Sequence, residues 1–253
     1  MRAFASALTL AFAMASTGKA QDQSERKFVV VEFLKIAAGK GAEYRDLERK
    51  WKEVHQDRVN KKQVESWSLY SVRLPGASAS RKYDTITMHV FSSFQKLERM
   101  YDEEQQAKIR TLPPAGPLRT MVDSQIWSVF RTAGPDLLSS KYAEVLFHKA
   151  KPGHLGDYLR AQSEHYAPIN EELVKSGVRN AWHSFGLIFP GGTEREYDWV
   201  TFDCFEKFDA VAGDTTAGID RQRVAAAAKA VSQHRDTVRA EYWQLLDRTA
   251  TSR

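Results

Sequence analysis

Four polar side chains occupy strand-like positions in the two halves of this sequence. Glu32 and His89 each alternate with apolar residues in short runs rich in β-branched side chains. His148 and Asp203 do the same in the second half of the chain. Alternation with a period of two is typical of β-strands, whose successive side chains point to opposite faces of a sheet. We predict that the apolar faces pack under helices, so that these polar side chains point the other way, into an internal lumen.

The chemistry of such side chains depends on which of them meet. Neighbouring strands would bring Glu32 to His89 and His148 to Asp203, which gives one carboxylate–histidine pair in each half. A carboxylate beside an imidazole holds the ring, raises its basicity and prepares it to transfer protons near neutral pH. We take His89 with Glu32 as the first candidate for a catalytic pair. The alternative is that each pair is a satisfied polar contact with no catalytic task.

A further candidate lies on the first expected helix. His55 follows Trp51 by four residues and therefore shares its buried face. Both His55 and Asn170 stand twelve residues before a tryptophan, Trp67 or Trp182, so they occupy equivalent places in the two halves. The difference suggests that only the first half carries a proton-transfer group there, with His55 as the reserve catalytic residue. The alternative is a side chain near the helix end that bonds to nearby backbone.

The aromatic residues are expected first in the core, where their large apolar surfaces are best buried. If the enclosed space holds a substrate, five side chains are expected to contact it: Trp67, Tyr70, His148, Trp182 and Asp203. A metal site would need two histidines and two carboxylates to converge, namely Glu32, His89, His148 and Asp203.

Motifs for cofactors are missing from the sequence. No HxH, HExxH or CxxC spacing supports a metal site. Two histidines on expected helices, His55 and His165, could serve as axial ligands of haem. There is no G-x-G-x-x-G, no G-x-x-x-x-G-K-[ST] and no G-x-S-x-G, which disfavours nucleotide-dependent and serine-hydrolase chemistry. We therefore expect no cofactor and assign no metal ligand.

An internal duplication positions these residues. The stretch from Gln63 to Phe94 returns from Val178 to Phe208, and Pro75-Gly76 matches Pro190-Gly191. Each copy predicts two strands around a turn, followed by a helix. The first half is expected to contain strands at 28–36, 64–74, 83–91 and 122–132, with helices at 42–60 and from Phe94 to about Ala107. The second half is expected to contain strands at 142–150, 178–189, 197–205 and 239–246, with helices at 155–175 and 219–233.

This order is β-α-β-β-α-β twice, which predicts an α+β fold of two ferredoxin-like units, at 28–133 and 141–250. A single unit leaves one sheet face bare, so two units in one chain can pack these faces together as an intrachain α+β barrel. Over residues 28–250 the sequence resembles the dimeric α+β barrel superfamily, which includes cofactor-free monooxygenases, EthD-like proteins and haem enzymes related to chlorite dismutase. The resemblance implies a cavity between sheet and helices, which His55 would line. An oligomer is not needed to close such a barrel.

The N-terminal residues have the pattern of a signal peptide. Arg2 precedes an apolar, uncharged run, and Gly18-Lys19-Ala20 provides small residues for cleavage after Ala20. We expect residues 1–20 to be removed and the mature protein to be periplasmic or secreted, without a membrane-spanning helix. Loss of Arg2 and Lys19 takes the formal charge from +5 to +3, with both signs mixed along the chain. Nucleic acid is therefore not an expected partner.

These observations favour an exported, nucleotide-independent enzyme that acts on a small apolar or aromatic molecule, by monooxygenase-like or proton-transfer chemistry. Two other classes remain open, namely a non-catalytic protein that binds a ligand in the same cavity, and a structural or interaction module. The single cysteine, Cys204, excludes an intramolecular disulfide and is expected to be a small buried side chain. The sequence does not identify a substrate.

Overall fold

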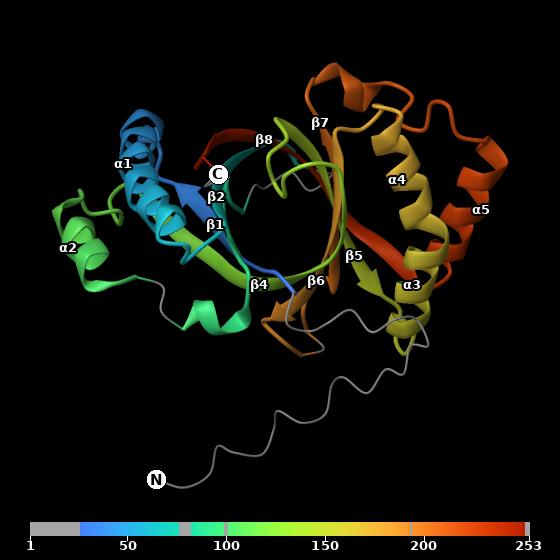
Figure 1. The fold of residues 1–253 in the computed structure, drawn as a ribbon, viewed down its shortest axis with the longest axis horizontal. Helices are drawn as coiled ribbons and strands as arrows, with labels where there is room; N and C mark the ends of the chain where they lie inside the picture. Colours follow the sequence, from blue (N-terminus) through green and yellow to red (C-terminus); the bar gives the residue numbers. More distant parts are fainter. Residues whose placement is uncertain (1–25, 76–81, 99–100, 193, 251–253) are drawn as a thin grey trace, which may run out of the picture.

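Eight antiparallel strands form a closed barrel in the computed structural model, which describes residues 26–75, 82–98, 101–192 and 194–250 (Figure 1). Around the barrel the strands follow the order β1-β3-β2-β8-β5-β7-β6-β4. Their bounds are β1 Phe28–Ile36, β2 Ser66–Pro75, β3 Thr85–Phe91, β4 Arg119–Ala133, β5 Tyr142–Ala150, β6 Ala181–Phe189, β7 Trp199–Phe205 and β8 Arg235–Arg248.

The helices lie outside the barrel, with α1 and α2 on one side of it and α3, α4 and α5 on the other (Figure 1). Their bounds are α1 Gly41–Asn60, α2 Glu103–Thr111, α3 Leu155–Ala161, α4 Ala167–Lys175 and α5 Arg221–Ser232. One π-helical turn, Gln162–Tyr166, joins α3 directly to α4. Element types and order confirm the predicted α+β fold class.

Each half of the chain contributes four neighbouring strands. Within a half, the first and third strands pair with each other, as β1 does with β3 and β5 with β7. The halves meet along two seams, where β2 pairs with β8 and β4 pairs with β6. The barrel thus closes within one chain, as the duplication predicted.

The apolar faces of the strands fill the interior of the barrel. Phe33, Trp127, Phe202 and Trp243 come from both halves and contact one another there, with ring centroids 5.3–6.5 Å apart. An eight-stranded barrel is just wide enough for side chains to fill. The predicted orientation is therefore wrong, because the apolar sets line the interior and the polar sets face the helices.

Hydrogen bonds cross between the halves inside the barrel. Tyr83 donates to both carboxylate oxygens of Glu241, at 2.7 and 2.8 Å, and Tyr197 donates to Gln125 Oε1 at 2.6 Å. Each acceptor also receives the indole N–H of the tryptophan two residues further on, at 2.7 Å. The acceptor is a carboxylate in one half and an amide in the other, so the arrangement is symmetric in position and asymmetric in charge.

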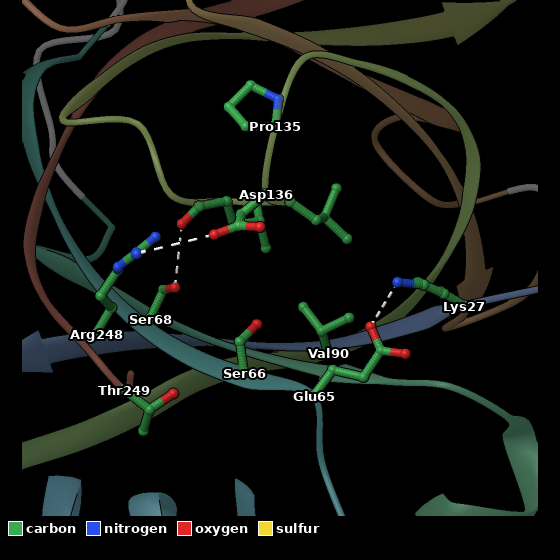
Figure 2. A pocket seen from close by; sticks show the side chains of 11 residues that line it. Lys27, Glu65, Ser66, Ser68, Val90, Pro135, Asp136, Arg248 and Thr249 are labelled. Atoms are coloured by element: carbon green, nitrogen blue, oxygen red, sulfur yellow. Dashed lines mark hydrogen bonds and ion pairs between the residues drawn. The ribbon is translucent and has the colours of Figure 1, made fainter. Parts of the chain in front are cut away.

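The segment that connects the halves covers one end of the barrel. The Leu138 side chain is buried, and its carbonyl accepts hydrogen bonds from Tyr70 at 2.9 Å and Ser68 at 3.2 Å. A cavity of about 160 Å³ remains beside this connection (Figure 2). Two ion pairs lie among the residues that line this cavity, Lys27 with Glu65 at 2.6 Å and Arg248 with Asp136 at 4.0 Å (Figure 2).

The second helix of the first half starts later than the sequence predicted. The helix expected from Phe94 is instead a 3₁₀ turn at Phe94–Leu97, and α2 starts after Asp102, whose side chain accepts from the backbone N–H of Gln105. The proposed signal peptide lies outside the described residues. Of the helices that the structure describes, none has the length and apolar character needed to cross a membrane.

Candidate functional site

Helix α1 presents polar side chains to the sheet on the same face as its apolar ones. Tyr44, Leu47 and Val54 are buried at steps of three and seven residues, which places them on one helix face as the sequence pattern predicted. His55 and Arg58 lie on this face and are also buried. Buried charged groups are rare unless they are paired, so this side of the helix is unusual for a structural contact.

His55 lies between helix and sheet, as predicted. Its ring stacks with Trp51 on α1 and Trp67 on β2, with centroids 5.7 and 4.9 Å away. The ring of His89 approaches edge-on at 4.8 Å. Burial, together with the neighbouring His89 and Arg58, holds the pKa of His55 well below its ordinary value. His55 is therefore neutral at pH 7, and its buried Nδ1 has no hydrogen-bond partner among the described residues.

Arg58 contacts the second histidine of this region. Its Nη1 lies 3.3 Å from His89 Nδ1. A guanidinium offers only N–H donors, so His89 Nδ1 accepts and the ring proton resides on Nε2. Burial, with Arg58 close by, lowers the pKa of His89 to about 3. His89 can therefore donate a proton in a hydrogen bond, but its lone pair is already occupied.

The guanidinium of Arg58 is otherwise poorly paired. It lies over the ring of Tyr101, 4.5 Å from the centroid, and 5.7 Å from that of Phe91. Its Nε and Nη2 atoms are buried without hydrogen-bond partners among the described residues. An aromatic face attracts a cation but does not accept hydrogen bonds as an oxygen does. Arg58 thus retains donors that an anionic group could use.

A buried carboxyl lies two helical turns before His55. Glu48 Oε1 is 3.4 Å from Arg119 Nε, an ion pair without hydrogen-bond geometry. Burial raises the pKa of Glu48 to about 7, although Arg119 acts in the opposite direction. Glu48 can therefore gain or lose a proton near neutral pH. We call Glu48, His55, Arg58, Trp67 and His89 the α1 cluster.

The predicted pairing of Glu32 with His89 is not formed. Glu32 lies opposite Thr87 in the register of β1 and β3, and Thr87 Oγ1 donates to its carboxylate at 2.8 Å. His89 lies opposite Val30 and contacts Arg58. Neither side chain points into the barrel interior, because their face of the sheet is the one under α1. The strands were correctly predicted to be adjacent, but the partners and the side of the sheet were wrong.

The second half has a corresponding cluster under α3 and α4, in which a buried arginine and a buried aspartate form an ion pair. Arg179 Nη1 lies 2.9 Å from Asp203 Oδ1 and also contacts Asn170, the counterpart of His55. Burial raises the pKa of Asp203, and Arg179 opposes that shift. We call Asn170, Arg179 and Asp203, together with His148 and Arg235, the α4 cluster.

The predicted pair of His148 and Asp203 is also not formed. His148 Nδ1 accepts from Arg235, which leaves Nε2–H to donate to Thr201 Oγ1 at 3.0 Å. Asp203 lies opposite Glu144 in the strand register and is bound to Arg179. The four residues of the hypothetical metal set are thus divided between the α1 and α4 sides of the barrel and do not converge.

The aromatic residues expected near a substrate divide between two environments. Trp67 lies in the α1 cluster, where it stacks on His55. Trp182 pairs with Asp203 in the strand register, which places it on the face of the α4 cluster. Tyr70 instead belongs to the barrel interior, 6.0 Å from Trp243. Of the three, Trp67 is the one that stacks on a histidine with a free ring nitrogen.

Unpaired buried atoms distinguish the two clusters. Around α1 they are His55 Nδ1, two guanidinium nitrogens of Arg58, the indole N–H groups of Trp51 and Trp67, Glu48 Oε1 and Arg119 Nε. Around α3 and α4 they include both amide atoms of Gln162, the hydroxyl of Tyr158, the indole of Trp182 and the Nε atoms of Arg179 and Arg235. Of these two described clusters, the α1 cluster is the one that combines an unpaired imidazole nitrogen with a cation that lacks a carboxylate partner.

Three important residues were not identified from the sequence, namely Glu48, Arg58 and Arg119. Arg58 stands three residues after His55, so the same helical spacing that placed His55 could have placed it. Glu48 follows the buried Tyr44 by four residues, so helical spacing could have placed it on the same face as well. Arg119 is at the start of β4, and its approach to α1 depends on tertiary packing.

No protein-family model matches the chain, and none of the curated proteins matches it. Solved structures do match its fold. An anthrone oxidase-like protein is 15% identical over 90% of this chain and 94% of its own, with a TM-score of 0.53. A monooxygenase candidate from Lactobacillus acidophilus NCFM is 10% identical over 89% and 96%, with a TM-score of 0.54. A haem-binding protein from Thermus thermophilus is 11% identical over 87% and 91%, with a TM-score of 0.54. The chain therefore shares the α+β barrel fold of these structures, as the sequence indicated.

Proposed function

We propose that this α+β barrel is a nucleotide-independent, monooxygenase-like enzyme that removes a proton from a small aromatic substrate in the α1 cluster. One observation supports this most directly: the unpaired Nδ1 of a neutral His55 and the unpaired donors of Arg58 are buried within one turn of α1. Neither arrangement stabilises the fold, since unmet buried polar groups cost about 1–3 kcal/mol each. A bound ligand would satisfy both.

The two groups have complementary roles. His55 Nδ1 is the base, and Arg58 binds the oxygen on which negative charge develops. Suitable substrates carry an acidic C–H or O–H conjugated to an aromatic ketone or phenol, since their anions are delocalised. The indoles of Trp51 and Trp67 supply flat apolar surface for such a ring system.

The low basicity of His55 in the free protein is compatible with this role. Its pKa is lowered by burial and by the neighbouring His89 and Arg58. An anion that forms on the substrate beside the ring acts in the opposite direction and raises that pKa. Proton transfer to His55 and charge development near Arg58 therefore stabilise each other in the transition state.

With dioxygen as the second substrate, a methylene group between aromatic rings would become a carbonyl. The balance is CH₂ plus O₂ to C=O plus H₂O, in which one oxygen atom enters the product and the other leaves as water. The proton taken by His55 returns to the departing water. The chain's own residues bind, orient and ionise the substrate in this scheme, and the oxidant is dioxygen.

The test is oxygen consumption with anthrone as the probe, because one structural neighbour is described as anthrone oxidase-like. The wild-type protein should accelerate consumption above the uncatalysed rate. His55→Ala and Arg58→Met should each lower kcat/KM by about 10²–10⁴-fold, the range typical of a general base or an oxyanion donor. Asn170→Ala, at the equivalent place in the other half, serves as the matched control and should retain activity.

Other outcomes separate the alternatives. Saturable quenching of tryptophan fluorescence by anthrone without oxygen uptake would indicate a binding protein rather than an enzyme. Activity that survives both the His55 and the Arg58 substitutions would exclude the α1 cluster as the site. Circular dichroism of each variant should show that the barrel remains folded.

Neither of the two helix histidines is placed to ligate haem, although one structural neighbour binds it. His165 is exposed on the outer side of its helix. The ring of His55 is stacked with two indoles, and His89 lies at its edge, so it does not face a flat apolar slot. We therefore derive no step through haem.

Export is also part of the proposal. Residues 1–20 have the charge and hydropathy pattern of a signal peptide. Cell fractionation with N-terminal sequencing of the mature protein should find it outside the cytoplasm and beginning at Gln21. A mature chain that still begins at Met1 would contradict this.

A further inference from the structure

Two histidines and an aspartate meet on the surface where α3 begins and α5 ends. His154 immediately precedes α3, Asp157 lies in its first turn, and His234 lies between α5 and β8. Their ligand atoms all lie within 4.8 Å of one another. Among the residues that the structure describes, no other group of three histidine, cysteine or acidic side chains is this close.

Two of the three ligand distances are close to the edge length of a tetrahedral metal site. His154 Nδ1 lies 3.1 Å from His234 Nδ1, and 3.8 Å from Asp157 Oδ2. Zinc binds imidazole nitrogen and carboxylate oxygen at about 2.0–2.2 Å, so ligand atoms in a tetrahedron lie about 3.3–3.6 Å apart. Small shifts of flexible side chains would bring all three atoms to one ion.

The backbone holds the two segments in register. Lys151 N–H donates to the His234 carbonyl at 2.9 Å, and His234 N–H donates to the Val231 carbonyl at 3.1 Å. These bonds fix the segment before α3 against the end of α5. The positions of the two histidines are therefore set by the fold and do not require a metal.

The three side chains are accessible to solvent, so a metal ion could reach them. The side chains of His154 and Asp157 are 47% and 48% exposed. The other carboxylate oxygen of Asp157 lies 3.8 Å from Arg160 Nη1, and Oδ2 is the oxygen nearer to His154. A site with three protein ligands leaves the fourth tetrahedral position to water.

We propose that His154, Asp157 and His234 bind a divalent transition metal ion, with Zn²⁺ as the reference ion. Two imidazoles and one carboxylate suit zinc, copper and nickel, and disfavour Mg²⁺ and Ca²⁺, which prefer oxygen ligands. The site is separate from the α1 cluster, since it lies on the elements of the other half. A bound ion would connect the start of α3 to the end of α5.

The test is isothermal titration of the full, untagged mature chain with ZnCl₂, followed by thermal unfolding with and without the metal. The wild-type protein should bind one equivalent and unfold at a higher temperature, by roughly 5–10 °C at a hundredfold excess of free metal over Kd. His234→Ala should weaken binding by at least about a hundredfold, since even outer ligand partners account for ten- to hundredfold effects. Asp157→Asn should weaken it less, because an amide oxygen is retained.

His165→Ala provides the matched control, as it removes an exposed histidine from the same continuous helix. Binding unchanged in this variant and lost in His234→Ala supports the proposal. Co²⁺ should give the intense visible absorption of a tetrahedral complex. No binding by the wild-type chain at free zinc on the order of 100 micromolar would overturn the proposal, since the expected site is tighter than this. Equal binding by His234→Ala would overturn it too, as would MgCl₂ competing equally well.

Discussion

Replacing Glu48 by glutamine should change how stability depends on pH. The carboxyl is 3% exposed, and its pKa rises from 4.5 to about 7 on folding, mainly through burial. Between these values the folded chain holds more protons than the unfolded chain, so the wild-type protein loses stability as pH rises through this window. Glu48→Gln has no such loss, because the amide does not ionise.

The size of the effect follows from the pKa difference. Each pKa unit corresponds to about 1.4 kcal/mol, so the difference in unfolding free energy between variant and wild type should grow by about 3 kcal/mol from about pH 4 to about pH 8. For a domain of this size, this corresponds to a relative rise in Tm of about 6–12 °C. The difference is the useful quantity, because contributions from the buried histidines occur in both proteins and cancel.

Urea unfolding at several pH values between about 4 and about 8.5 measures this difference. Glu43→Gln is the matched control, since Glu43 lies on the same helix with its side chain 53% exposed. The control should show little change at any pH. If the Glu48→Gln difference is constant across the window, or decreases toward high pH, then Glu48 does not titrate near neutrality and the α1 cluster contains no carboxyl that exchanges protons there.

Three further perturbations test other parts of the structure. Arg179→Met should lower the free energy of unfolding, measured with urea, by about 3–5 kcal/mol, because it leaves buried Asp203 without its partner. Arg58→Met should be close to neutral or stabilising, because Arg58 has no carboxylate partner. Equal costs for the two substitutions would contradict this difference in pairing. Leu138→Ala should cost about 2–5 kcal/mol through a cavity at the barrel end, and a cost under about 1 kcal/mol would mean that the connection does not seal it. His89→Gln should reduce the loss of stability on acidification. The pKa of His89 falls to about 3 on folding, so the wild-type protein loses stability as the pH drops below the pKa of a free histidine. Acid unfolding that is unchanged in the variant would contradict this.

Much of the fold was predictable because the duplication repeats both local patterns and turn positions. The recurrence of tryptophan and Pro-Gly pairs placed the strands of each half, and adjacency of β1 with β3 followed from the element order. Strand alternation also sorted residues correctly into two faces. The alternation could not show which face lies inside the barrel, because a period of two residues groups side chains on one face without saying whether that face points inward or outward.

The orientation depends on how the two halves close. In an eight-stranded barrel the interior takes large side chains such as Trp127 and Trp243, and these fill it. Glu32 and His89 were expected in a wet interior, but that space is occupied, so they lie under α1 instead. The helix periodicity that placed His55 did not depend on this choice, which is why its burial against the sheet was predicted correctly.

The closure of the barrel within one chain has a consequence for how its two halves can differ. In a symmetric dimer of a single-unit chain, each substitution appears in both copies and must be tolerated in both. Here Gln125 and Glu241 take the same structural place with different charge, and His55 and Asn170 differ likewise. The second half thus pairs Arg179 with Asp203, while the first half retains unpaired polar atoms on His55 and Arg58. Because the two halves belong to one chain, structurally equivalent positions can carry different residues.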